Sequence, residues 1–440
     1  MTKHLLIQAI AILGIGHLWA ALPDATNTPK TPAAAIFDSD PSHLWNRVHQ
    51  AFFIRPDTGS ESLDPDAVDP PLWPDTSSFL KTGSSHQTAI AVLDEFLAGD
   101  GDALISDPLK RAVMQHDLWS VFDWSANSQP PASDQGTAEK NMAALRSKLS
   151  RAIRQLALSP DQIAALPDNL TNTLAAGEFN RSYDPEHPQA PFLPGDLLDP
   201  QGPWVCVRGA LNGPSAPVHV EYYQGRSPFL VFLQLPGGRK ATLNYLSALN
   251  QATNKIEKHQ TAELPQFPVG TKTALLRQMN VIDNSGQIRM TPLTQTLQMR
   301  VYRLVGKDVT DHENSQAAVK FRMKRRDLFT AGHAGLVPIN WSEPLRVSLL
   351  QHNDRYERKN SASGIATTMQ SCIACHSCGG ATVHSIFTYK QDDWVPAANA
   401  IAPNRLRLTA TQSATEAKKI SDWKMKRYEW GLLKGLFESR

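Results

Sequence analysis

The 440-residue sequence lacks the short motifs of several large enzyme classes. It has no glycine-rich phosphate loop, no HExxH metalloprotease pair and no GxSxG nucleophile turn. Its 44 basic and 42 acidic residues nearly balance, without the basic excess of a nucleic-acid-binding protein. Beyond the N-terminus, no apolar run approaches the roughly 18 residues of a membrane span. These absences argue against nucleic acid as a partner, and the sequence identifies no small-molecule substrate.

Cysteine is also scarce, with four in the whole chain, so the protein is not a small disulfide scaffold. Cys372, Cys375 and His376 have the CxxCH spacing of covalent c-type haem attachment. From the composition, about 0.001 such pentapeptides are expected by chance. On a helical turn, residues i and i+3 share a face, so both thiols can bond to one porphyrin edge while His376 faces the iron. The sequence therefore predicts one covalent haem c.

Two other chemistries use closely spaced cysteines and remain alternatives. A thioredoxin-like redox pair belongs at a strand-to-helix turn, whereas residues 361–371 are rich in Ser and Thr and contain no buried-strand run. A zinc site would gather Cys372, Cys375, His376 and Cys378 around one ion, and the adjacent Cys375 and His376 reach one tetrahedral ion only with difficulty. Haem attachment is the interpretation that fits the spacing best.

The stretch from Ser371 to His376 resembles the attachment helix of a c-type cytochrome domain. The long region before it is similar to exported bacterial proteins that carry one such motif near the C-terminus. The resemblance implies that Cys372 and Cys375 anchor the haem, that His376 is the proximal iron ligand, and that the protein transfers electrons. A haem enzyme with an open distal site, peroxidase-like in activity, and a haem-linked sensor or binding protein are the alternatives.

The sixth iron ligand stays open because no Pro-Met or Gly-Met loop follows the motif. His384 could serve if the helix ends at Gly379 and Gly380 and the chain folds over the ring. Met425 could serve as in electron-transfer cytochromes, although its place on an expected helix over 414–437 favours core packing. The remaining alternatives are another residue, such as Met323 or His352, and an open coordination site.

The N-terminus has the pattern of an export signal. Lys3 and His4 precede a largely apolar stretch over 5–21, and Pro23 follows. Two outcomes fit this pattern. The segment is either cleaved after Ala20 or Ala21, or retained as an N-terminal anchor. Either outcome places the protein in the periplasm or another extracytoplasmic compartment, where c-type haem is attached. We therefore expect a redox partner protein in the cell envelope.

The periodicity of the rest of the chain predicts an α+β fold in three parts: a helical domain over 44–178, a β-rich domain over 204–350 and a mostly helical cytochrome-c-like segment over 361–440. The proline-rich stretch 180–203 separates the first two. Helices are expected at 44–53, 88–97, 108–124, 138–158 and 241–258, and from Pro160, with Asp107 and Ser159 as N-caps. Strands are expected at 204–207, 218–223, 229–235, 274–282, 287–290, 296–304 and 319–323, forming an antiparallel sheet.

Three further groups have more than one interpretation. His116 lies on a partly apolar helix face, which favours a hydrogen-bonded core histidine over an iron ligand. Lys320 and Arg322 give the strand at 319–323 a basic face, and Lys324, Arg325 and Arg326 then form either a solvated edge or a dock for an acidic redox partner or a haem propionate. Cys206 and Cys378 are either two free thiols or a disulfide.

Overall fold

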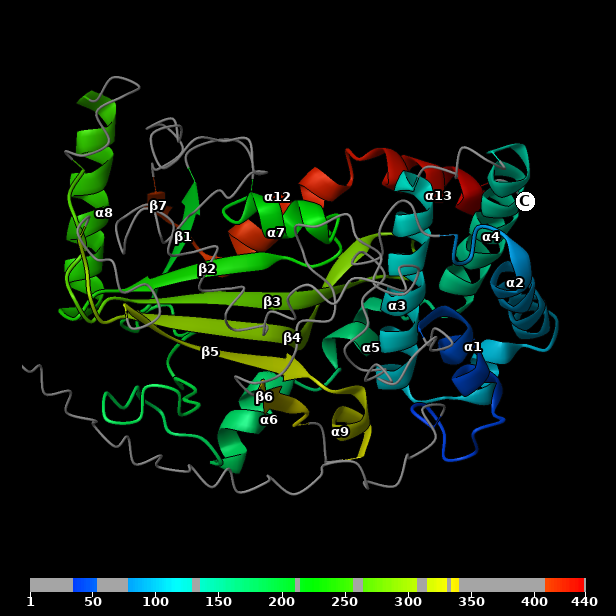
Figure 1. Ribbon diagram of the computed structural model, residues 1–440, viewed down its shortest axis with the longest axis horizontal. Coiled ribbons are helices and arrows are strands. Elements are labelled where there is room, and N and C mark those ends of the chain that lie inside the picture. Colours follow the sequence, from blue (N-terminus) through cyan, green and yellow to red (C-terminus); the bar gives the residue numbers. More distant parts are fainter. Residues whose placement is uncertain are drawn as a thin grey trace, which may run out of the picture. The chain divides into compact units, whose positions relative to one another are not determined.

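The computed structural model describes a central antiparallel sheet with helices before it, beside it and after it (Figure 1). The described residues are 35–53, 78–128, 135–209, 214–255, 264–306, 315–330, 334–339 and 408–438. All of these described residues belong to one compact unit. The CxxCH motif and the export signal lie outside the described residues. The expected class of mixed helix and sheet, with helices toward both ends, is confirmed.

The N-terminal part is helical, as expected. Its elements are α1 (Leu44–Phe53), α2 (Gly83–Ala98), the 3-10 helix η4 (Gly101–Leu104), α3 (Pro108–Asn127), α4 (Gln135–Gln155), α5 (Pro160–Ala164) and α6 (Asn169–Ala176). Local chemistry sets their starts: the Asp107 carboxylate accepts the Leu109 N–H ahead of Pro108, and Ser159 forms a capping box with Gln162. Both predicted N-caps are therefore confirmed.

Within the described ranges the sheet has seven strands, all paired antiparallel, in the order β6-β5-β4-β3-β2-β1-β7. The strands are β1 (Val205–Gly209), β2 (Phe229–Gln234), β3 (Lys272–Ile282), β4 (Ile288–Tyr302), β5 (Gln316–Met323), β6 (Leu336–Pro338) and β7 (Leu408–Ala410). The helices α7 (Pro217–Tyr222), α8 (Gly238–Lys255) and α9 (Arg325–Thr330) lie between strands in the sequence, and α12 (Ser413–Lys424) and α13 (Tyr428–Glu438) follow the last one.

Three local expectations are wrong. Residues 218–223 are not a strand, because Pro217 occupies the first helical position and starts α7. The two strands expected at 287–290 and 296–304 are one strand, β4, which stays paired with β3 through register shifts near Arg277 and Gln278. The single last helix expected over 414–437 is two helices, because the chain turns after Lys424.

Each face of the sheet carries its own apolar core. The larger core joins one sheet face to the N-terminal helices, and α13 packs against α3 and α4 at the same core. The smaller core lies on the opposite face, where α8 and α12 pack on β1, β2 and β7. We call these the helix-packed face and the second face. None of the helices in the described ranges is long and apolar enough to cross a membrane.

Candidate functional site

Most of the residues that the sequence assigns to the haem site lie outside the described residues. These are Cys372, Cys375, His376, His384 and His352. Met425 is described: it directly follows α12 and is 41% exposed. The expectation that Met425 packs in the core is therefore wrong. Met323 ends β5 and is buried in the larger core, on the helix-packed face.

The described part of the chain gathers basic side chains on the second face of the sheet. Neighbouring residues of a strand point to opposite faces, so the residues that alternate with core positions must point away from the helix-packed face. The core positions of β4 and β5 are Leu297, Met299, Val301, Val319 and Phe321. Arg300 and Lys320 alternate with them and therefore lie on the second face.

The strand register brings a third cation beside these two. Directly paired residues share a face, and the pairs are Gln298 with Lys320, and Thr296 with Arg277. Gln298, Thr296 and Arg300 alternate along β4, so Arg277 projects from the same face as Arg300 and Lys320. We call Arg277, Arg300 and Lys320 the basic cluster. It spans the three adjacent strands β3, β4 and β5.

Aromatic rings and hydroxyl groups hold the guanidinium groups of this cluster. The Arg277 guanidinium lies 3.5 Å from the centre of the Tyr223 ring, an arrangement that suits a planar cation. The Arg300 Nη1 atom donates a hydrogen bond of 2.8 Å to Tyr302 Oη. Both arginines are buried, with 5% and 6% of their surface exposed. Their side chains are therefore oriented before any ligand binds.

His219 of α7 is a titratable group whose pKa is shifted by the charges of this cluster. Its ring stacks on Phe229, with 5.4 Å between the ring centres. Burial lowers the pKa of His219 to about 4, and the positive charges of Lys320, Arg300 and Arg277 contribute to the shift. The imidazole is therefore neutral at neutral pH. Guanidinium and ammonium groups such as those of the cluster are the kinds of side chain that bind anions, above all carboxylates and phosphates.

His116 is a hydrogen-bonded core residue, as the sequence favoured. Its Nδ1 lies 2.8 Å from the Asn280 carbonyl oxygen, and its Nε2 lies 3.0 Å from the Gln295 side-chain nitrogen. Burial, reinforced by nearby arginines, holds its pKa well below the ordinary value. Both ring nitrogens are thus engaged within the core.

A second group of charges is buried between α3, α12 and α13. The Asp123 Oδ2 atom accepts from Arg226 Nη1 at 3.0 Å and from Lys424 Nζ at 2.6 Å. Lys424 Nζ also donates to Glu429 Oε1 at 3.0 Å. These four side chains are fully buried. They join elements far apart in the sequence, which is a structural role.

The interpretation of residues 324–326 as a solvated edge is wrong for Arg325. Its Nε atom donates to Asp117 Oδ2 at 3.0 Å, and Arg325 is buried. The first turn of α9 is thereby tied to α3. Lys324 and Arg326 remain partly exposed on either side.

Cys206 is a buried free thiol in β1. Burial raises its pKa to about 12, so the thiol stays protonated at neutral pH and is a poor nucleophile. Cys378 lies outside the described residues.

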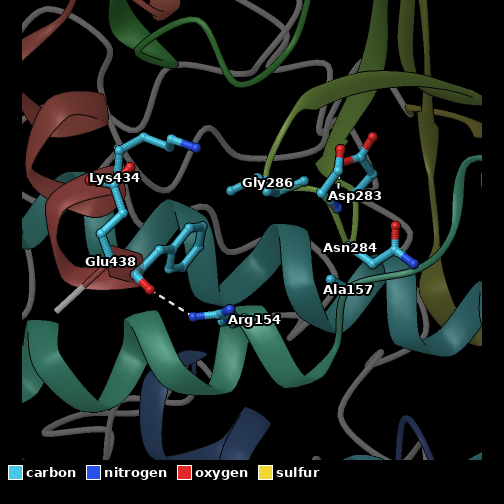
Figure 2. Close-up of a pocket in the computed structure, with 10 residues that line it drawn as sticks. Arg154, Ala157, Asp283, Asn284, Gly286, Lys434 and Glu438 are labelled. Atoms are coloured by element: carbon cyan, nitrogen blue, oxygen red, sulfur yellow. Dashed lines mark hydrogen bonds between the residues drawn. The ribbon is translucent and has the colours of Figure 1, made fainter. Parts of the chain in front are cut away.

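A small pocket lies between the C-terminal end of α4, the turn after β3, and α13 (Figure 2). It has a volume of about 180 Å³, and the Arg154 Nη1 atom donates to the Phe437 carbonyl oxygen across it at 2.6 Å. Arg154, Lys434, Asp283 and Glu438 all line it, so the lining mixes both charges. It is smaller than ordinary ligand sites, at roughly 300 to 1,000 Å³, and nothing in its lining selects a ligand.

Within the described ranges, no group of three or more His, Cys, Asp or Glu side chains is placed to hold a metal ion. Comparison with protein-family models, with curated proteins and with solved structures finds no match to this chain. The basic cluster is therefore the described feature with the clearest ligand chemistry. The sequence shows the basic face of β5, whereas the cluster with Arg277 and Arg300 follows only from the pairing of β3, β4 and β5.

Proposed function

We propose that this chain is an exported electron-transfer protein with one covalent haem c. The carrying observation is the CxxCH motif, in which Cys372 and Cys375 tether the porphyrin and His376 ligates the iron. A haem supplies an iron atom that exchanges one electron reversibly. The export pattern of residues 1–21 supports the same proposal, because both features belong to an extracytoplasmic protein.

One feature of the described residues supports the proposal. A haem carries two propionate carboxylates, and buried guanidinium groups are the preferred partners of carboxylates. Arg277 and Arg300 are buried and oriented on the second face of the sheet. The electrons would pass to a redox partner protein in the cell envelope.

A spectrum of the full-length exported protein, matured in a host that attaches c-type haem, tests the proposal. We expect a pyridine haemochrome spectrum of haem c with two thioether bonds, and its loss when both Cys372→Ser and Cys375→Ser are introduced. Six-coordinate low-spin iron that does not bind carbon monoxide would support electron transfer. High-spin iron that binds it would favour the peroxidase-like enzyme or the sensor. Unmodified Cys372 and Cys375 in the mass spectrum of matured protein would refute the proposal.

A further inference from the structure

Three side chains of the buried charge network have the contacts of an amide-forming site. Lys424 Nζ lies 2.6 Å from Asp123 Oδ2 and 3.0 Å from Glu429 Oε1. The fold thus holds an amine against one carboxyl group, which replaces the high concentration that a reaction between separate molecules would need. The second carboxylate contacts the same nitrogen, so it can take up protons from that nitrogen.

This site is closed to bulk solvent and lined by indole rings. The three side chains are fully buried. The Trp119 ring lies 5.7 Å from Lys424 Nζ, and Trp430 packs on Trp119 with 5.9 Å between the ring centres. Burial lowers the pKa of Lys424, although the charges of Asp123 and Glu429 oppose that shift. These surroundings therefore favour the uncharged amine, which is the nucleophilic form.

Glu429 is a carboxylate in this site, as a proton acceptor must be. Burial raises its pKa, but the charge of Lys424 and hydrogen bonds outweigh burial and leave the pKa below its ordinary value. Its contact with Lys424 Nζ places it beside the atom that must lose protons when an amide forms. Glu429 is therefore suited to act as a base toward Lys424.

The carboxyl oxygen Asp123 Oδ1 is buried and has no hydrogen-bond partner among the described residues. A buried oxygen without a partner destabilises the folded state, and so do two charges removed from water. Amide formation removes that oxygen and both charges of the Asp123–Lys424 pair. Arg226 and Glu429 keep opposite charges, so the rest of the network stays balanced.

We propose that Asp123 and Lys424 form an intramolecular amide bond, with Glu429 as the proton relay. Lys424 Nζ attacks Asp123 Cγ, the C–N bond forms and the Cγ–Oδ1 bond breaks. Nζ gives up two of its three protons, Glu429 passes them on, and they leave with Oδ1 as one molecule of water. Arg226 Nη1, 3.0 Å from Oδ2, stabilises the negative charge that builds on that oxygen during the attack. Glu429 ends the reaction unchanged, and no oxidant or second substrate is consumed.

The bond joins α3 to α12 across 301 residues of sequence. A covalent link that closes so long a loop restricts the unfolded chain, as a disulfide does. Unlike a disulfide, it is not broken by a reductant. It would hold the C-terminal helices on the N-terminal ones even in denaturant.

Peptide mass spectrometry of the natively folded, full-length protein tests the bond. Trypsin cuts after lysine and arginine, so Asp123 lies in the peptide 112–140, and an amide at Lys424 blocks cleavage there and leaves 420–426 intact. We expect these two peptides to be joined, with the mass of one water missing from their sum. Lys424→Arg keeps the positive charge but not the amine, so its digest should contain no joined peptide. Lys418→Arg, at an exposed position of α12, is the matched control and should keep it.

The relay has its own test. Glu429→Gln keeps Asp123 and Lys424 and removes the proton acceptor, so the joined peptide should form at least about 100-fold more slowly after refolding. Circular dichroism verifies that each variant is folded. Wild-type protein that yields the Asp123 and Lys424 peptides only as separate, unmodified species would overturn the bond, whatever the variants do. Formation of the joined peptide in folded Glu429→Gln at the wild-type rate would overturn the relay. None of these measurements involves haem, so their outcome is independent of the haemochrome spectrum.

Discussion

Lys424 Nζ lies 2.6 Å from Asp123 Oδ2, although 301 residues separate the two in the sequence. Both side chains are fully buried. Burial lowers the pKa of Lys424, and the charges of Asp123 and Glu429 oppose that shift. The ion pair ties α12 and α13 to α3, so residues far apart in the sequence depend on each other for charge compensation.

Replacement of Lys424 is expected to be costly. Lys424→Met leaves Glu429 with only the partly exposed Arg427, at 3.4 Å, and leaves Asp123 with Arg226 alone, so the free energy of unfolding should fall by about 3 to 5 kcal/mol. Urea unfolding followed by circular dichroism measures this change. Lys418→Met is the control, because Lys418 is 74% exposed in its pair with Asp422 and should change stability by no more than about 1 kcal/mol. Equal changes in the two variants would contradict the structural role of the network.

The same substitution should cost much less at one buried histidine than at another. Neither ring nitrogen of His49 has a hydrogen-bond partner among the residues that the structure describes, whereas His116 bonds Asn280 and Gln295. His49→Leu should therefore change the free energy of unfolding by less than about 1 kcal/mol. His116→Leu strands the buried groups that faced the ring and should cost about 2 to 3 kcal/mol. Urea denaturation at pH 7.5 compares them, and a larger loss in His49→Leu would contradict the assignment.

The stability of the protein should fall in mild acid. Burial, with help from nearby cations, lowers the pKa values of His49, His116 and His219, the last to about 4. An unfolded histidine titrates near pH 6.5, so below that pH the unfolded chain binds more protons than the folded chain. The stability contribution of each histidine is complete above about pH 6.5 and is lost progressively below it, for His219 as the pH falls toward about 4. Each such histidine adds a slope of up to about 1.4 kcal/mol per pH unit.

The measurement for this pH dependence is a series of urea titrations between pH 7.5 and 4.5. His49→Leu removes one of the three groups, so its slope should be lower than that of the wild type by up to one proton. A wild-type stability that stays constant from pH 7 to pH 5 would show that these rings are not held neutral.

Cys206 should react with alkylating reagents only after unfolding. Its pKa of about 12 leaves almost no thiolate at pH 8, and the side chain is buried. Mass spectrometry after iodoacetamide treatment should find Cys206 unmodified in native protein and alkylated in guanidinium chloride without a reductant. A requirement for reductant would instead show that Cys206 and Cys378 form the disulfide that the sequence left open.

The sequence predicts the helices whose first residues are fixed by interactions between neighbouring residues. Asp107 before Pro108 and the Ser159 capping box start their helices as expected, because each cap involves residues within one turn. The run at 218–223 misleads because its residues favour strands, while Pro217 and packing of Val220 in the smaller core favour a helix. Local preference is outweighed there by tertiary packing.

The described site could be predicted only in part. The alternation of apolar and basic residues around Lys320 predicts the basic face of β5. Arg277 and Arg300 lie on the same face because of how the strands pair, and no single segment of the sequence shows that pairing. Buried arginines also contradict the usual expectation that such side chains lie on the surface. The contact between Asp117 and Arg325 could not be predicted from the sequence either, because 208 residues separate the two.

The order of β6 and β7 at opposite edges of the sheet has a consequence for genetics. Lys424 and Trp430 are encoded after the CxxCH motif and belong to the buried interior. A premature stop codon that removes the motif therefore also removes the edge strand β7 and the helices α12 and α13. The product should then be degraded for reasons unrelated to haem. Only point substitutions within the motif can separate loss of the cofactor from loss of the fold.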